Sequence, residues 1–392
     1  MRYLTIEEYD ETERRAMERL PNRVVEAFQP IVFSKLGYPV HVRSDHELRR
    51  YIDVMHENRF ADYFNQILSG LTPDEFDDFQ GILAAVCDFT EDHFGKVAIA
   101  RGTILQSMNV LRHIDFLPYS ASPRVLELGP GSGCLGAGLM LKGCPYASMD
   151  VTQAFYLYQN RFFTHLTQGK LVDGVLSGAA PAELLTYIPQ GGGVHIPWWQ
   201  YAELTPEEMP AFDIVTCNHA ICEMHGSSLR FSLLLAQAAL GRSADPFRAF
   251  IFQGWGQSGQ TERAAATRLF YDFGFRLVHN DHNIVVFVPA DSPGAVGHLV
   301  FPEGRSAYPP VAHSSKDNPL SQAIADGRTK IRDYQYVGLD QLETLLTVII
   351  GSDQHMTEDE MFSAKEELQK IINEANATLE ATFEKKQTEV MG

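Results

Sequence analysis

The fold of this chain is decided by residues 124–136, RVLELGPGSGCLG. Residues 124–128 form an apolar run with one acid, which predicts a buried parallel strand. The glycines that follow allow a sharp reversal of the chain and bring bare backbone N–H groups close to a ligand. A helix is expected to begin near Cys134, because apolar side chains recur after it. A strand, a glycine turn and a helix in this order form a nucleotide-type ligand site at the carboxyl end of a sheet.

The glycines of this stretch fit two different patterns. Gly131, Gly133 and Gly136 have the Gly-x-Gly-x-x-Gly spacing of a dinucleotide fingerprint. Glu127 and Gly129 instead extend the series to Glu-x-Gly-x-Gly-x-Gly, which resembles the first motif of class I S-adenosylmethionine-dependent methyltransferases. The resemblance implies S-adenosylmethionine as the cofactor. The residues that it assigns to cofactor binding are Glu127, Gly129, Gly131 and Gly133.

A second segment of the chain also resembles this family. Residues 146–150 predict a short strand that ends in an acid, Asp150, after the glycine loop. A carboxylate at this place can accept hydrogen bonds from both ribose hydroxyls of the cofactor. The alternative is that Asp150 only caps the helix opening at Val151, because aspartate is a favoured N-cap residue.

A third segment resembles the fourth-strand motif of the family. Residues 212–225, FDIVTCNHAICEMH, begin with an aspartate-led apolar strand and continue into Asn218 and His219. The resemblance implies that Asn218 lines the methionine part of the cofactor. The elements expected next are a helix over 228–240, a strand over 248–253, a helix over 261–273, and strands over 275–278 and 284–289.

The predicted fold class is therefore α/β, a Rossmann-like class I methyltransferase sheet that is mostly parallel with an antiparallel final strand. The resemblance covers residues 97–290, and the ends of the chain lie outside it. Residues 1–96 are predicted to form a helical N-terminal module, with a capping box at residues 44–47. In the family such modules build a dimer contact or a wall of the substrate pocket. Arg101, at the start of the next helix, is expected either to reach the cofactor carboxylate or to form a surface ion pair.

Two further segments do not follow the family pattern closely. Residues 161–190 are an insertion, after which residues 194–199 fall where the third strand is expected. Aromatic side chains there flank the adenine in the family, and Trp198 is predicted to do so, unless it is a core aromatic. Residues 291–392 are predicted to be a C-terminal extension, first a proline-rich irregular cover for the substrate and then an amphipathic helix from Thr357. This helix would pack on the body or form a dimer contact.

The chemistry of methyl transfer needs alignment of donor and acceptor, and a base when the acceptor is a hydroxyl. His219 is the first candidate for the base, because a neutral histidine suits proton removal. His225, Glu223 and His282 are alternatives, and His219 could equally be a wall residue. His219, Glu223 and His225 also have a metal-like spacing. A catalytic metal is not expected. Metal-dependent sugar and catechol methyltransferases place acids at the end of the following strand, and here residues 253–257, QGWGQ, supply no carboxylate.

Composition excludes several classes of function. The formal net charge is −18 and there is no basic run, which disfavours nucleic acid as a partner. The five cysteines are scattered without a Cys-x-x-Cys pair, which indicates a reducing compartment. No apolar stretch reaches the roughly twenty residues of a membrane span. The chain begins without the apolar core of a signal peptide, so a cytoplasmic location is expected.

The function predicted from the sequence is methyl transfer to a small-molecule hydroxyl, on a sugar or another natural product. This layout is similar to that of sugar and natural-product O-methyltransferases. Nitrogen or carbon acceptors stay open. A nicotinamide-dependent oxidoreductase and a non-catalytic scaffold are the other classes considered. A homodimer is a possible assembly.

Overall fold

The computed structural model describes residues 1–31, 39–54, 64, 68, 70–98, 100–119, 121–256, 260–281, 283–296, 318–332, 339–352 and 370. They belong to two compact units. The first unit comprises Met1–Val54 and Val110–Arg332, and the second comprises Met55–Asn109 and Asp333–Gly392. The predicted division at residues 96 and 290 stays a prediction.

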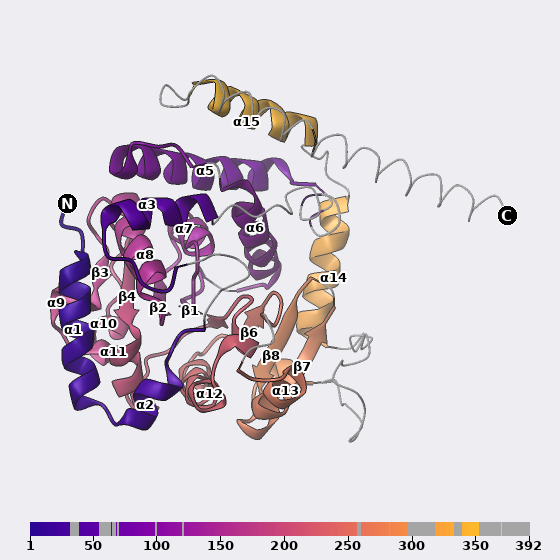
Figure 1. Ribbon diagram of the computed structural model, residues 1–392. Helices are drawn as coiled ribbons and strands as arrows, with labels where there is room; N and C mark the ends of the chain where they lie inside the picture. Colours follow the sequence, from indigo (N-terminus) through magenta and orange to yellow (C-terminus); the bar gives the residue numbers. More distant parts are fainter. Residues whose placement is uncertain are drawn as a thin grey trace, which may run out of the picture. The chain divides into compact units, whose positions relative to one another are not determined.

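A sheet of eight strands forms the centre of the first unit, in the order β3-β4-β2-β1-β5-β6-β8-β7 (Figure 1). All neighbouring strands are parallel except that β8 runs antiparallel to both β6 and β7. This confirms the predicted fold class. The strands are β1 Val125–Leu128, β2 Tyr146–Asp150, β3 Val172–Asp173, β4 Gly193–Pro197, β5 Ile214–Thr216, β6 Ala249–Phe252, β7 Phe275–Asn280 and β8 Val285–Pro289.

The order of the strands reverses on the two sides of β1. β1 pairs with β2 on one side and with β5 on the other, so that Val125 lies opposite both Tyr146 and Ile214. All four residues of β1 are buried, as expected for a strand in the middle of a parallel sheet. A reversal of this kind leaves a crevice outside the carboxyl ends of the central strands, where α/β proteins bind ligands.

Helices pack on both the central and the final strands. α7 and α8 contact β2, α12 contacts β5 and β8, and α13 contacts β7. Among the helices of the described residues, none is both long enough and apolar enough to cross a membrane. The helices of this part are α7 Cys134–Leu141, α8 Gln153–Leu166, α9 Gly174–Ser177, α10 Pro181–Thr186, α11 Trp198–Glu203, α12 Gly226–Gly241 and α13 Arg263–Asp272.

One local prediction is wrong, and the insertion at 161–190 has secondary structure of its own. The expected third strand over 194–199 ends at Pro197, and the two tryptophans begin helix α11 instead. Pro197 is the N-cap residue of that helix, and proline cannot donate a ladder hydrogen bond that would extend the strand. The insertion at 161–190 contains the short edge strand β3, which pairs with β4, and the helices α9 and α10.

Three N-terminal helices belong to the first unit, and α1 lies against the sheet domain. The Tyr9 ring of α1 contacts the rings of Tyr156 at 5.2 Å and Trp199 at 5.0 Å between centroids. The Leu4 N–H donates to Asn160 Oδ1 at 3.0 Å. The three helices are α1 Ile6–Arg19, α2 Asn22–Ala27 and α3 Asp45–Val54.

The C-terminal part differs from the expected irregular segment. A helix, α14 Pro319–Arg332, lies between the proline-rich segment and Thr357, where the sequence predicts no helix. Residues 297–317 and most of the helix predicted from Thr357 lie outside the described residues. The second unit contains α5 Pro73–Phe94 and α15 Leu339–Ser352, and α6 Arg101–Phe116 has residues in both units.

Candidate functional site

The glycine loop lies directly after β1, at the carboxyl edge of the sheet. Gly129, Gly131 and Gly133 have φ angles of 70°, 57° and 76°, in the left-handed region that favours glycine. Gly133 is the N-cap residue of α7. A Cβ at Gly133 would lie 2.9 Å from Phe163 Cε1, so a side chain would collide with α8 as well as strain the backbone. The loop thus presents backbone groups at the start of a helix, as the sequence predicts.

The third glycine of the dinucleotide spacing has a packing role. A Cβ at Gly136 would lie 2.5 Å from the Tyr146 hydroxyl oxygen. This hydroxyl donates to Glu127 Oε2 at 2.7 Å. Gly136 therefore leaves room for the tyrosine that holds the motif acid, which accounts for this glycine without a dinucleotide.

Glu127 is a buried acid at the end of β1. Its side chain is 2% exposed. Burial raises its pKa to about 7, and hydrogen bonds from Tyr146 and Asn218 oppose that rise. The structure thus brings together Glu127 and Asn218, two residues that the sequence assigns to one site although they lie far apart along the chain.

Asp150 is a second buried acid, at the end of β2, and it is 2% exposed. Oδ1 accepts from the Thr152 N–H at 2.9 Å, and Oδ2 accepts from Gln159 Nε2 at 2.8 Å. Burial raises its pKa to about 6, and the hydrogen bond from Gln159 is the largest opposing effect. The N-cap residue of α8 is Thr152. Asp150 therefore supports the start of this helix, and its predicted contact with a ribose stays a prediction.

Asn218 connects the ends of β5 and β6. Its Nδ2 donates to Thr216 Oγ1 at 2.9 Å, and its Oδ1 accepts from the Gln253 N–H at 2.9 Å. The side chain is half-buried. These bonds orient the carboxamide beside Glu127, next to the glycine loop.

His219 has an unusual backbone conformation and close neighbours. Its φ is 55°, a left-handed value that few residues other than glycine adopt. Its N–H donates to the Gln253 carbonyl at 3.0 Å. A Cβ at Gly254 would collide with the ring at Nδ1, and a Cβ at Gly256 would collide with the His219 carbonyl. Two glycines with positive φ thus leave the space that this histidine occupies.

The other candidate bases lie in different surroundings. His225 is exposed, and its Nδ1 accepts from the Ser227 N–H at 3.2 Å as the N-cap residue of α12. Glu223 is half-buried and ends a short 3₁₀ turn, Ile221–Glu223. His282 lies outside the described residues. Within the part of the chain that is described, no group of three or more His, Cys, Asp or Glu is placed to hold a metal ion.

Trp198 lies against the N-terminal helices. Its side chain is 2% exposed, and its ring stacks on Phe28 with 5.9 Å between centroids. Its Nε1 donates to Glu13 Oε1 at 2.7 Å. The predicted role beside an adenine stays a prediction. Arg101 begins α6 and belongs to the second unit, so its predicted contact with the cofactor also stays a prediction.

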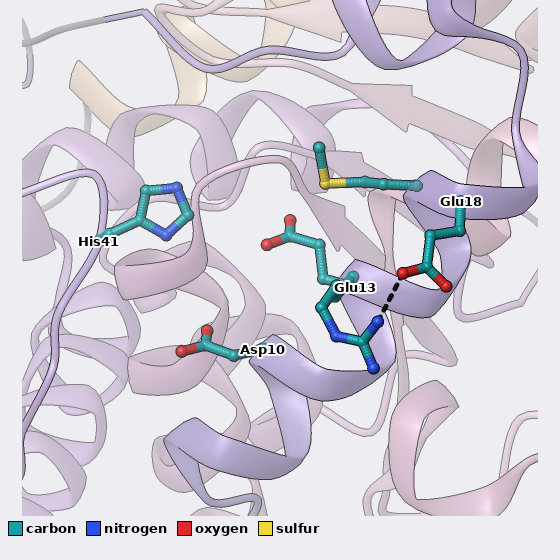
Figure 2. A pocket seen from close by; sticks show the side chains of 6 residues that line it. Asp10, Glu13, Glu18 and His41 are labelled. Atoms are coloured by element: carbon teal, nitrogen blue, oxygen red, sulfur yellow. Dashed lines mark hydrogen bonds and ion pairs between the residues drawn. The ribbon is translucent and has the colours of Figure 1, made fainter.

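A hollow of about 390 Å³ beside α1 was not expected from the sequence. Figure 2 shows the Glu13 carboxylate directed toward the His41 ring, with Asp10 beside them. Asp10 Oδ1 accepts a hydrogen bond from Gln153 Nε2, at the start of α8, at 2.6 Å. Burial raises the pKa of Glu13. On α1 the spacing of the lining residues by three and four positions could have predicted that they share one face of the helix. The lining residues are Asp10, Glu13, Arg14, Met17, Glu18 and His41.

No protein-family model matches this sequence, and no curated protein matches it. Solved structures similar to the chain include a TehB-like SAM-dependent methyltransferase from Corynebacterium glutamicum, at 12% identity and TM-score 0.31, covering 46% of this chain and 87% of that one.

A magnesium protoporphyrin IX methyltransferase from Synechocystis with bound SAM is similar at 14% identity and TM-score 0.29, over 53% of this chain and 97% of that one. The CcbJ methyltransferase from Streptomyces caelestis is similar at 13% identity and TM-score 0.29, over 47% and 89%. Likenesses at these scores carry no weight for function, which has to be argued from the strand order and the site of the chain itself.

Proposed function

We propose that this protein is an S-adenosylmethionine-dependent methyltransferase that acts on a small molecule. The observation that carries the proposal is the convergence of three features at the carboxyl edge of the sheet. These are the left-handed glycine loop, the buried acids Glu127 and Asp150 at the ends of β1 and β2, and Asn218 after β5. The set matches, position by position, the family motifs that the sequence resembles.

The residues present fit such a cofactor chemically. The glycines of the loop from Gly129 to Gly133 carry no side chains, so a ligand can approach the backbone closely. Gly133 has to be glycine, because a side chain there would collide with Phe163. In this proposal the Asp150 carboxylate accepts hydrogen bonds from the ribose hydroxyls. Asn218 lines the methionine part of the cofactor, and Glu127 belongs to the same cofactor site. The cofactor, when bound, supplies a methyl group activated by a sulfonium.

The acceptor is proposed to be a hydroxyl of a sugar or another natural product. His219, held in a left-handed conformation at the end of β5, is proposed to remove the hydroxyl proton. Nitrogen and carbon acceptors are retained as alternatives, because no residue of the sequence excludes them.

A nicotinamide-dependent oxidoreductase is the second candidate, because Gly131, Gly133, Gly136 and Asp150 have the required spacing. The packing of Gly136 on Tyr146 already explains the third glycine. A non-catalytic scaffold is the third candidate. A homodimer and a cytoplasmic location are also proposed, and the net charge of −18 disfavours nucleic acid.

The test is calorimetric titration of the protein with S-adenosylmethionine, S-adenosylhomocysteine, NAD and NADP, with Asp150→Ala as the comparison. We expect micromolar binding of both adenosyl ligands, and loss of binding in Asp150→Ala. Tight binding of NAD or NADP without heat from the adenosyl ligands would make the protein a dehydrogenase candidate instead. The absence of heat from all four ligands would favour the scaffold.

A further inference from the structure

Gln159 connects two parts of the candidate cofactor site. It lies on α8, and its side chain is fully buried. Its Nε2 donates to the Gly131 carbonyl at 2.8 Å and to Asp150 Oδ2 at 2.8 Å. The two hydrogens of one amide nitrogen thus join the glycine loop to the acid at the end of β2.

The sheet alone does not determine the distance between these two partners. The registered pairing of β1 with β2 ends at Leu128 and Met149, before both Gly131 and Asp150. Gly131 has a left-handed φ of 57°, and nothing lies within 4 Å of the position that a Cβ would take there. The Gly131 backbone hydrogen-bonds the Asp150 carboxylate directly. Gln159 Nε2 adds a second connection, between the Gly131 carbonyl and the same carboxylate.

The orientation of the amide is determined by its partners. Gly131 offers a carbonyl and Asp150 a carboxylate, and both accept hydrogen bonds, so exchange of Nε2 and Oε1 would lose both. Gln159 Oε1 is buried and has no hydrogen-bond partner among the described residues. A buried acceptor without a hydrogen-bond partner lowers the stability of the folded state. Gln159 nevertheless keeps the orientation in which its Nε2 bonds both Gly131 and Asp150.

We infer that Gln159 is a positioning residue of the cofactor site, which holds the glycine loop and the Asp150 carboxylate in the geometry that binds the ribose of S-adenosylmethionine. This inference rests on the proposed function. Gln159 acts in two ways. Together with the Gly131 backbone hydrogen bond, it maintains the separation of loop and acid. Its N–H also favours the ionised form of Asp150, which accepts hydrogen bonds from hydroxyls.

Asn160 provides a matched control on the same helix. It is also a fully buried amide, and its Nδ2 donates to a different buried carboxylate, Asp173 Oδ2, at 2.9 Å. Gln159→Ala and Asn160→Ala each remove an amide–carboxylate bond from α8. Only Gln159→Ala changes a contact of the candidate site. Comparison of the two variants therefore separates a change in ligand binding from a general loss of stability.

The experiment is calorimetric titration of the full chain with S-adenosylhomocysteine between pH 5 and pH 8, with thermal unfolding of each variant. We expect Gln159→Ala to raise the Kd roughly tenfold at pH 7. The pH at which affinity falls on acidification should move upward, because Asp150 loses a donor that lowers its pKa. Gln159→Glu, which replaces the donor by a second carboxylate, should bind less tightly at pH 8 than at pH 6. Asn160→Ala should keep the wild-type Kd and pH profile.

Unchanged affinity and an unchanged pH profile in Gln159→Ala, while Asp150→Ala no longer binds, would overturn the inference and leave the proposed function intact. A wild-type protein that binds neither adenosyl ligand would overturn both. Equal losses of affinity in Gln159→Ala and Asn160→Ala would show that packing of α8, and not this connection, supports the site.

Discussion

At the scale of single residues, the site is defined by two buried carboxylates. Glu127 and Asp150 lie at the ends of neighbouring strands, each 2% exposed, and burial raises both pKa values, to about 7 and about 6. Burying a carboxylate without a cationic partner is costly. Hydrogen bonds from Tyr146 and Gln159 reduce this cost without removing it. Buried carboxylates with raised pKa values are typical of functional sites.

The raised pKa of Glu127 predicts a pH-dependent stability. Its pKa rises from an ordinary value of 4.5 to about 7 on folding, so the folded state binds this proton more tightly than the unfolded chain. The free energy of unfolding should therefore fall by up to about 3 kcal/mol as the pH rises through this window. Glu127→Gln should remove that part of the dependence, measured as thermal unfolding at pH 5 and pH 8.

The control for this prediction is Glu7→Gln, which changes an exposed acid in the first turn of α1. It should keep the wild-type difference between pH 5 and pH 8. If Glu127→Gln also keeps the full wild-type difference, the buried acid is not its source.

At the scale of elements, the turn after β6 shapes the place of His219. Gln253 contacts both Asn218 and His219 through its backbone, and the Cys222 N–H donates to the Trp255 carbonyl at 2.7 Å. These bonds hold the two turns after β5 and β6 side by side. Gly254, with φ 65°, lies where a side chain would meet the histidine ring.

Gly254→Ala is expected to displace the His219 ring and to destabilise the protein. The left-handed backbone costs about 1 kcal/mol for alanine, and the collision with the ring adds about 1–3 kcal/mol. Gly274→Ala is the matched control, because Gly274 has φ 80° and nothing lies within 4 Å of its Cβ position. Denaturant unfolding gives the stabilities, and the ring resonances of His219, assigned with His219→Gln, report its position. If Gly254→Ala and Gly274→Ala changed stability and these resonances equally, a collision with the His219 ring would not be the cause.

At the scale of the whole molecule, distant segments of the first unit meet at a polar cluster of His113, His279, Asp281 and Arg328. Arg328 Nη1 donates to Asp281 Oδ2 at 2.6 Å, and its Nη2 lies 2.7 Å from His113 Nε2. His279 Nε2 lies 2.8 Å from the same carboxylate oxygen. The cluster joins α14 to α6 and to the turn between β7 and β8.

Arg328→Met is expected to destabilise the attachment of α14. The side chains of Arg328 and Asp281 are 29% and 23% exposed, so the loss should be about 1–2 kcal/mol, between surface and buried ion pairs. Burial raises the pKa of Asp281, but hydrogen bonds from His279 and Arg328 outweigh this effect and hold the pKa well below its ordinary value. The stabilisation is therefore complete above about pH 4 and is lost progressively as the pH falls from there toward the much lower folded-state pKa of Asp281.

Urea unfolding at pH 7 of Arg328→Met, Asp281→Asn and the double variant measures this effect as a double-mutant cycle. Lys330→Met, an exposed change on the same helix, should leave the midpoint unchanged. A loss from Arg328→Met that is equally large in the Asp281→Asn background would show that lost packing, and not the charged pair, is responsible.

The sequence by itself determined the central strands, the glycine turn and the acids at the strand ends. These follow from local rules, since apolar runs bury, glycine alone adopts left-handed turns without strain, and parallel strands end at one edge. Only the tertiary structure decided that Trp198 packs on Phe28 and bonds Glu13, that Gly136 makes room for Tyr146, and that Gln159 joins Gly131 to Asp150. Each of these depends on which side chain a remote segment brings into contact. The direction of a side chain inside a core is set by its packing partners, which local patterns of sequence do not specify.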